Sequence, residues 1–249
     1  MIAEFLFDRE EELQGLRQRL GTRQAFLLYG PSGVGKSMLL KRALPDFPAT
    51  LYSAESSSVQ SVFRNLAAEL LVRKDPHVTR SVGRSGTEGL KTKSALALKG
   101  IVMDALHDGK YQVVLDHLKL PSHSFATAVR EILGWGDTPV VSVARSAHME
   151  DIGFLAPFYA DRSERCELRN FAPLQAEQFA AQAAARAGLC AQNMSEFLER
   201  VLEFSSGNPG AILSMLEMAS DPKYQSAGNI KITPLYVDFR MNWKPVGVR

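Results

Sequence analysis

The chain has 249 residues, of which 45% are hydrophobic and 22% are charged. This composition is ordinary for a globular protein and supplies enough apolar residues for a sizeable core. The 29 basic and 27 acidic residues give a net charge of +2, which neither requires nor excludes a nucleic-acid partner. No apolar stretch is long enough to span a membrane, and the N-terminal residues lack the regions of a signal peptide.

The cysteines point to a reducing compartment. Cys166 and Cys190 have neither the spacing of metal ligands nor that of a disulfide framework. We therefore expect both side chains to be buried or half-buried, and we expect a cytoplasmic protein without a membrane partner.

The first predicted elements are a helix over residues 8–21 and a strand over residues 24–29. The helix is indicated by Leu13, Leu16 and Leu20, which share one face at helical spacing. After the strand, the chain becomes rich in glycine and then returns to a helix-compatible stretch that stops before residue 45.

The glycine-rich segment matches G-x-x-x-x-G-K-[ST], and its place between a strand and a helix predicts a phosphate-binding loop. The glycines permit backbone angles that let the amides close around an anion, and the positive end of the next helix points to the same place. Lys36 can reach the β- and γ-phosphates, and Ser37 can ligate Mg²⁺. We expect nucleotide contacts from the whole run, which comprises Gly30, Pro31, Ser32, Gly33, Val34, Gly35, Lys36, Ser37 and Met38.

A strand over 50–54 and a helix over 59–72 follow, and then the pattern breaks. Residues 73–93 are rich in Gly, Ser and Thr, which predicts a long surface loop, and loops of this length are usually functional or disordered. Two interpretations are open: a solvated charged segment, or a DNA-binding segment. The charges are Arg73, Lys74, Arg80, Arg84, Lys91 and Lys93 against Asp75 and Glu88.

A helix over 94–107 leads to a buried strand over 111–116, which ends at Asp116. A carboxylate at that position can hold Mg²⁺ through water, and the alternative is a turn or helix-cap aspartate. His117 comes next and has three open roles: catalytic base, sensor or partner contact, and structural residue. Glu55, at the end of the neighbouring strand, is a candidate for a displaced catalytic carboxylate.

A helix over 124–133 and a strand over 139–144 lead to Arg145. A guanidinium at this strand end can meet the γ-phosphate, and a salt-bridged surface arginine is the alternative. A linking segment over 145–162 and a last strand over 165–168 complete this part of the chain.

Strands that alternate with helices up to residue 170 predict an α/β core. We expect a mostly parallel five-stranded sheet with helices on both faces and with ligand at the carboxyl ends of the strands. Helical periodicity without strands then predicts a lid with helices over 174–188, 194–205 and 209–219. The expected domains are a core over 1–172, a lid over 173–220, and a tail over 221–249 whose residues 232–240 form a short strand or extended arm.

Besides the phosphate loop, five motifs follow one another along the chain. They are Phe7-Asp8-Arg9-Glu10-Glu11-Glu12-Leu13, Val113-Val114-Leu115-Asp116, Ala144-Arg145-Ser146, Leu168-Arg169-Asn170-Phe171-Ala172-Pro173-Leu174, and Gly207-Asn208-Pro209-Gly210-Ala211. In this order they resemble the F-x-x-R-E-x-E-L segment, the Walker B strand, the sensor-1 strand end, the entry to the lid and the G-x-P lid motif of the AAA+-related P-loop ATPases. The groups concerned are the signal-transduction (STAND) ATPases and the origin-recognition and archaeal ATPases, and the resemblance covers residues 5–220.

This resemblance implies ATP or ADP with Mg²⁺ as cofactors. It places Arg9 and Pro209 near the adenine, and it gives Ser37 and Asp116 to the metal. Lys36 and Arg145 would read the γ-phosphate. The chain departs from the family at His117, where a second acid is usual, so we expect a weak ATPase that converts ATP and water slowly to ADP and phosphate. The few residues after 220 are too short for the usual winged helix, so an effector module would be absent or supplied by another protein.

Three functions are consistent with these patterns. The leading one is an ATP-dependent molecular switch with slow hydrolysis that acts on a protein partner or through self-association. The second is an ATP-dependent, DNA-associated accessory protein of the transposition or replication type, with residues 73–93 as the DNA contact. The third is a scaffold that holds a nucleotide without hydrolysing it.

Overall fold

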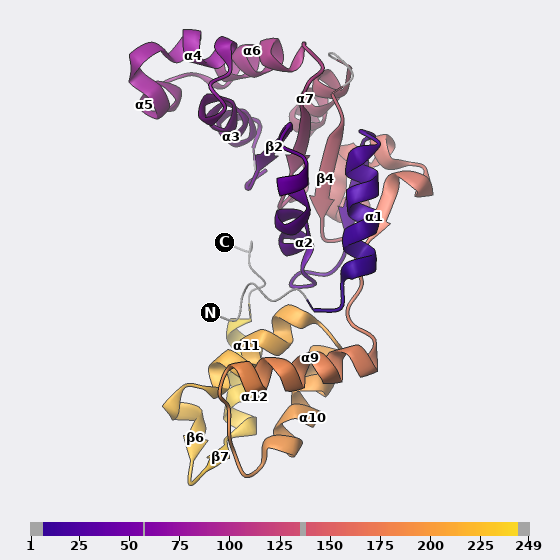
Figure 1. Cartoon of the computed structure of the whole chain (residues 1–249), viewed down its shortest axis with the longest axis vertical. Helices are drawn as coiled ribbons and strands as arrows, with labels where there is room; N and C mark the ends of the chain where they lie inside the picture. The colour runs from indigo at the N-terminus through magenta and orange to yellow at the C-terminus, as the bar shows by residue number, and fades with distance from the viewer. Residues whose placement is uncertain (1–6, 57, 135–137, 244–249) are drawn as a thin grey trace. The chain divides into compact units, whose positions relative to one another are not determined.

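A computed structural model describes residues 7–56, 58–134 and 138–243 (Figure 1). The chain forms two compact units. The sheet unit comprises Leu13–Gly30 and Leu40–Glu167, and the helical unit comprises Met1–Glu12, Pro31–Leu39 and Leu168–Arg249. The chain therefore passes between the units four times, and the segment after Gly30 is counted with the helical unit.

The sheet unit contains a five-stranded sheet in which every pair of neighbouring strands is parallel. Its strands are β1 (Phe26–Tyr29), β2 (Thr50–Ser53), β3 (Gln112–Leu115), β4 (Val140–Ala144) and β5 (Arg165–Glu167), in the spatial order β2-β3-β4-β1-β5. The predicted α/β fold with a parallel five-stranded sheet is confirmed. Because the strands are parallel, their carboxyl ends share one edge of the sheet.

The strands form where the sequence is continuously apolar. Each residue of β3 and β4 is buried, as expected for strands covered on two faces. In register, Tyr29 lies beside Ala144, and Leu115 lies beside both Ser53 and Ser142. The residues that follow these four strands therefore lie along one edge.

Helices flank this sheet and bury apolar side chains. They are α1 (Glu10–Gly21), α2 (Lys36–Ala43), α3 (Val59–Val72), α6 (Ala95–Leu106), α7 (His123–Gly134) and the short α8 (Met149–Ile152). Helix α3 starts at a Ser58 capping box and buries Val62, Phe63 and Leu66 at helical spacing. Helix α6 starts at Ser94, whose hydroxyl accepts the Ala97 N–H, and it packs along α3 (Figure 1).

The prediction of a long loop over residues 73–93 is wrong. This stretch folds into α4 (Pro76–Val82), a 3₁₀ turn and α5 (Gly86–Lys91), which lie beside α3 and α6 (Figure 1). The Asp75 carboxylate caps α4 by accepting the His77 N–H at 3.0 Å. Apolar side chains bury themselves in the core from both short helices, and this burial outweighs the low helix propensity of the intervening glycines; they are Val78, Val82 and Leu90.

The helical unit is built around three helices at the predicted positions: α9 (Pro173–Arg186), α10 (Met194–Ser205) and α11 (Pro209–Ala219). A small antiparallel hairpin follows, with β6 (Gln225–Ser226) and β7 (Asn229–Ile230). The last element is α12 (Ile232–Asn242). Phe179, Phe197 and Ile212 lie at the centre of this unit's core.

The prediction of an extended arm over residues 232–240 is also wrong, because this segment is the helix α12. Leu235 and Phe239, four residues apart, are buried in the helical core, whereas Val237 between them is exposed. Burial therefore follows the helical period and not the alternation of a strand. The domain boundaries at residues 172 and 220 remain predictions.

The two cysteines differ in exposure. Cys166 is half-buried but Cys190 is exposed, so the prediction that both are at least half-buried is wrong for Cys190, which lies in the connection between α9 and α10. Within the described parts of the chain, no helix combines the length and apolar character needed to cross a membrane.

Candidate nucleotide site

The phosphate loop connects β1 to α2, and its backbone is shaped by glycine. Gly33 and Gly35 have φ angles of +82° and +105°, a region in which an L side chain is strained. A Cβ atom on Gly35 would meet no described atom within 4 Å, so open space lies beside the loop. The Lys36 Nζ donates to the Pro31 carbonyl at 3.0 Å, and the Val34 N–H donates to the same oxygen at 3.3 Å.

Helix α2 begins at Lys36, directly after the last glycine of the loop. The first amides of an α-helix have no partner within the helix, and the helix dipole favours negative charge at that end. The loop and the helix start therefore form an arrangement that suits a phosphate group.

A mostly apolar pocket lies beside this loop, within the helical unit. It is formed by the N-terminal segment, the loop, the stretch before α9, α9 itself and the start of α11. Its lining residues are Phe7, Arg9, Gly33, Val34, Gly35, Met38, Leu39, Leu168, Phe171, Phe179, Pro209, Gly210 and Leu213. The pocket thus brings together three predicted contacts from distant parts of the sequence, Arg9, Met38 and Pro209, with the glycines of the loop.

Arg9 is part of the pocket wall and is only 6% exposed. Its guanidinium donates to the Glu12 carboxylate and, at 2.6 Å, to the Arg169 carbonyl. The same group lies 4.4 Å from the centre of the Phe171 ring, a cation–π contact. Phe171 in turn packs against Phe7 and Phe179. The charge of Arg9 is therefore already compensated, and its side chain holds the aromatic wall in place.

Asp116 follows β3 in the sheet unit and is 1% exposed. One carboxylate oxygen accepts the Tyr52 hydroxyl at 2.6 Å, and the other accepts the His117 N–H at 2.7 Å. Burial, and next the negative charge of Asp116, raise the pKa of Tyr52 well above its ordinary value. The buried carboxylate is thus hydrogen-bonded and fixed in orientation at the sheet edge.

His117 has an unusual backbone, with a φ angle of +56°. Its imidazole is half-buried, and its Nε2 lies 3.8 Å from the Asp116 carboxylate. The strained backbone turns the chain sharply at the end of β3, and such strain is often found at functional sites.

Glu55 and Arg145 occupy the same edge of the sheet, after β2 and β4. The Glu55 side chain is exposed, while its backbone carbonyl accepts the Ser53 hydroxyl and the Asn65 amide. Arg145 is exposed directly after Ala144, and no hydrogen bond or ion pair of its side chain is found within the described residues. The expected alternative of a salt-bridged arginine therefore has no support among these residues.

Two residues at these places were missed by the sequence patterns. Tyr52 reaches Asp116 only because β2 pairs with β3, and no motif marks that pairing. Asn208 donates to the Ser32 carbonyl of the loop at 2.9 Å. It stands inside the Gly207–Ala211 motif, so the motif marked its position without indicating its contact.

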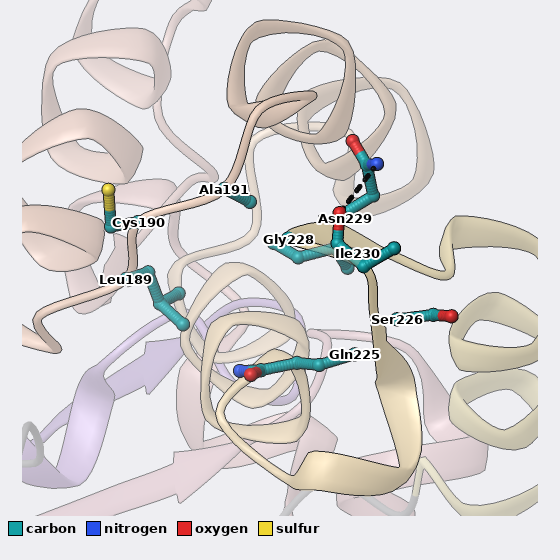
Figure 2. Close-up of a pocket in the computed structure, with 9 residues that line it drawn as sticks. Leu189, Cys190, Ala191, Gln225, Ser226, Gly228, Asn229 and Ile230 are labelled. Atoms are coloured by element: carbon teal, nitrogen blue, oxygen red, sulfur yellow. Dashed lines mark hydrogen bonds between the residues drawn. The ribbon is translucent and has the colours of Figure 1, made fainter.

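A second pocket in the helical unit lies between the α9–α10 connection and the β6–β7 hairpin (Figure 2). Gln225, Ser226 and Cys190 in its lining are exposed, and Asn229 is half-buried. Asn193, at the end of this connection, holds the hairpin: its Nδ2 donates to the Ile230 carbonyl and its Oδ1 accepts the Ile230 N–H. This pocket shares no residue with the pocket beside the phosphate loop.

Together, the parallel sheet in the order β2-β3-β4-β1-β5 and the glycine-rich loop after β1 are those of a P-loop NTPase fold. No protein-family model matches the chain, and no curated protein matches its sequence. Solved structures match the fold. The Walker-type ATPase of Pyrococcus abyssi has a TM-score of 0.56 at 16% identity, with coverage of 87% of this chain and 68% of that chain.

Two further solved structures give similar results. The Aeropyrum pernix ORC1 protein in complex with DNA has a TM-score of 0.63 at 15% identity, with coverage of 96% of this chain and 66% of that chain. A STAND protein with a tetratricopeptide repeat sensor from Pyrococcus horikoshii has a TM-score of 0.51 at 13% identity, with coverage of 97% and 33%. The chain thus spans about two thirds of the first two proteins and one third of the last.

Proposed function

We propose that this protein binds ATP together with Mg²⁺ and acts as a nucleotide-dependent molecular switch with slow hydrolysis. The observation that carries this proposal is the apolar pocket directly beside the glycine-rich loop. Ligand pockets typically combine apolar walls with a few placed polar groups. Here the flat adenine would lie against Phe171, Leu213 and Pro209, and the phosphates would lie on the loop.

The roles of single residues follow from their chemistry. Lys36 would hold the β- and γ-phosphates, and Arg145 would meet the γ-phosphate. Ser37 would ligate Mg²⁺ through its hydroxyl, and Asp116 would hold it through water. When bound, Mg²⁺ neutralises charge on the phosphate oxygens. No group of three or more His, Cys, Asp or Glu side chains in metal-binding arrangement is present in the described parts, and Mg²⁺ needs only one or two carboxylates beside substrate phosphates.

Slow hydrolysis is supported by the residue after Asp116. A carboxylate at that position could accept a proton from the attacking water; an imidazole can also accept a proton, but it differs from a carboxylate in geometry and charge. His117 also has a strained backbone, and its imidazole lies beside Asp116. Glu55, the other candidate base, is exposed.

The direct test is nucleotide titration by calorimetry together with turnover measurements on the same preparation. We expect the wild type to bind ATP and ADP, and we expect Lys36→Ala to lose at least about tenfold in ATP affinity, because a charge-assisted contact is worth about 1.5–3 kcal/mol. Lys41→Ala is the matched control, since Lys41 is exposed in the last turn of the same helix. Asp116→Ala should weaken the dependence of binding on Mg²⁺. A wild type without affinity for ATP would overturn the proposal.

The same measurements separate the switch from a scaffold. Nucleotide that remains bound through purification without any turnover would identify a scaffold that does not hydrolyse its ligand. Measurable turnover that is lost in Asp116→Ala would favour the switch.

A DNA-associated function is the second candidate, and two observations favour it. One solved structure with this fold is an ORC1 protein in complex with DNA. In addition, Lys74 and Arg80 are exposed on the α3–α4–α5 side of the sheet unit. Two charges of the segment are compensated, because Arg73 pairs with Glu69 and Lys91 pairs with Glu88.

This candidate is tested by DNA binding at increasing salt. Neutralisation of Arg80, Arg84, Lys91 and Lys93 should abolish a salt-sensitive affinity, while neutralisation of the exposed pair Lys41 and Arg42 should not. Absent or salt-insensitive binding would contradict it.

A further inference from the structure

The carbonyl groups at the tip of the phosphate loop are bound by the start of α11. The Gly210 N–H donates to the Gly33 carbonyl at 3.0 Å, and the Asn208 Nδ2 donates to the Ser32 carbonyl at 2.9 Å. These residues all belong to the helical unit. Two consecutive carbonyls of the loop are therefore held by one helix start.

Every hydrogen-bonding group of the Asn208 side chain has a partner. Its Oδ1 accepts the Ala211 N–H at 3.1 Å, which caps α11. Its Nδ2 donates to Ser32 and also to the Asn170 Oδ1 at 3.1 Å. Since the cap requires an oxygen on one side, the nitrogen must face the loop. Asn208 is 8% exposed; its bond from Ala211 is buried, and its bonds to Ser32 and Asn170 are partly buried.

The two bonds constrain which way the loop amides point. In a planar trans peptide, the carbonyl and the N–H point in opposite directions. The bond from Asn208 to the Ser32 carbonyl therefore turns the Gly33 N–H away from α11. The bond from Gly210 likewise turns the Val34 N–H away, and that N–H donates to Pro31. The Val34 N–H is thus bonded within the loop, whereas the Gly33 N–H points away from α11 and can face an anion.

The contact around Gly33 is also tight. A Cβ atom on Gly33 would lie 2.7 Å from the Asn208 Oδ1 and 3.3 Å from the Trp243 ring. Trp243 follows α12 and packs on Phe239 with ring centres 5.1 Å apart. The indole of Trp243 is thus close enough to Gly33 to report on the loop.

We propose that Asn208 is a positioning residue for the phosphate loop: through the Ser32 carbonyl it holds the loop in the form that grips phosphate. This inference rests on the proposed nucleotide function. Asn208 would touch the loop backbone and not the reacting atoms. The competing explanation is that Asn208 only caps α11.

Two substitutions separate positioning from capping. Asn208→Ser keeps a neutral side-chain oxygen that caps helices about as well as asparagine, but its side chain is too short to bridge to Ser32. Asn208→Ala removes both functions. Ser94→Ala is the control for the loss of a cap, since Ser94 caps α6 in the sheet unit. It should lower stability without changing nucleotide affinity.

The first readout is the Kd for ADP and for ATP with Mg²⁺. We expect Asn208→Ser to raise both constants about five- to tenfold, the size expected for one buried hydrogen bond, and Asn208→Ala to raise them at least as much. Capping alone would leave Asn208→Ser at the wild-type Kd, and that result would overturn the inference.

The second readout needs no nucleotide. The chain has two tryptophans, and Trp135→Phe makes Trp243 the only one. In that background, Asn208→Ser should shift the Trp243 emission to longer wavelength and increase its quenching by acrylamide, because a released loop no longer covers the ring. Unchanged emission and quenching would overturn the inference.

The two readouts also distinguish the inference from the proposed function. A wild type that binds nucleotide while Asn208→Ser binds equally well overturns only the positioning role. A wild type without nucleotide affinity, combined with a Trp243 shift in Asn208→Ser, overturns the proposed function and supports the contact between Asn208 and the loop.

Discussion

At the scale of single residues, the hydrogen-bond partners of Asp116 explain how a carboxylate can be buried at the sheet edge. The carboxylate is buried, and its two donors come from different sources, the Tyr52 hydroxyl on β2 and the His117 backbone. Without such partners, a buried carboxylate would be costly or would take up a proton. The tyrosine therefore belongs to the site even though it carries no catalytic group.

Two tyrosines, the half-buried Tyr52 and the buried Tyr159, make the free energy of unfolding depend on pH in the alkaline range. Burial is the main cause that raises the pKa of Tyr52 and that of Tyr159, whose hydroxyl donates to Ser142 at 2.7 Å. In the unfolded chain, tyrosine ionises near about pH 10. Their contribution to the free energy of unfolding is therefore fully present below about pH 10 and is lost as the pH rises towards the folded pKa values.

We expect denaturant titrations from about pH 8 to about pH 11 to give a free energy of unfolding that falls at the alkaline end. Tyr52→Phe and Tyr159→Phe should each make this fall shallower, since each removes one group that ionises only in the unfolded state. A fall of the same slope in both variants would show that other groups cause it.

At the scale of elements, the region α4–α5 shows where sequence patterns fail. Gly83, Gly86 and Gly89 lower helix propensity, and the two helices have only seven and six residues. Val78 and Val82 are four residues apart, which is a helical signal, but it is too short to outweigh the polar and glycine-rich surroundings. Tertiary burial decides the structure there, and that burial is not visible locally.

Burial in α5 gives a stability prediction. Leu90→Ala should lower the free energy of unfolding by about 2–3 kcal/mol, because the leucine is 2% exposed and its removal leaves a cavity. Leu96→Ala is the matched control, since Leu96 is 78% exposed on the neighbouring α6, and it should change stability by less than about 0.5 kcal/mol. Chemical denaturation measures both. Equal effects would contradict the burial of α5.

Helix α12 offers a second pair of substitutions, one at a buried position and one at an exposed position of the same helix. Leu235→Ala should cost about 2–3 kcal/mol of stability because Leu235 is buried in the helical core. Val237→Ala, on the exposed side of α12, should cost far less. The result expected for an extended arm would be two small effects of similar size.

The error at α12 has a physical cause. Leu235, Val237 and Phe239 alternate with Tyr236 and Asp238, which both carry a polar group, and Pro234 favours an extended conformation. Pro234 instead lies in the first helical turn, where its missing N–H costs nothing. The helical period becomes visible only in the structure, where Leu235 and Phe239 are buried and Val237 is exposed.

At the scale of the whole molecule, the alternation of strands and helices was sufficient to predict the parallel five-stranded sheet. The phosphate loop and Asp116 were located because spacing and apolar flanks mark them along the chain. The roles of Tyr52 and Asn208 could not be predicted, since both depend on contacts between segments far apart in sequence. The division into two compact units could not be predicted from the sequence either, because residues 31–39 belong to the helical unit although they lie between segments of the sheet unit.

Nucleotide binding should stabilise the entire chain. A ligand at about 100 times its Kd adds about 2.7 kcal/mol to the folded state, which corresponds to about 5–10 °C in Tm for a chain of this size. We expect ATP with Mg²⁺ to produce such a rise in thermal unfolding. Lys36→Ala should lose the rise while Lys41→Ala keeps it; a rise of equal size in Lys36→Ala would contradict the role of Lys36.

The close approach of Gly210 to the loop has a consequence for how this protein tolerates mutation. A Cβ atom at position 210 would lie 2.9 Å from both the Cα and the carbonyl oxygen of Gly33, and these are backbone atoms that cannot rotate aside. In a complete mutational scan, position 210 should therefore accept glycine alone. Its profile would resemble that of a catalytic position, although it has no side chain to contribute. The cause would be a requirement for space on α11, whose first turn donates a hydrogen bond to the loop.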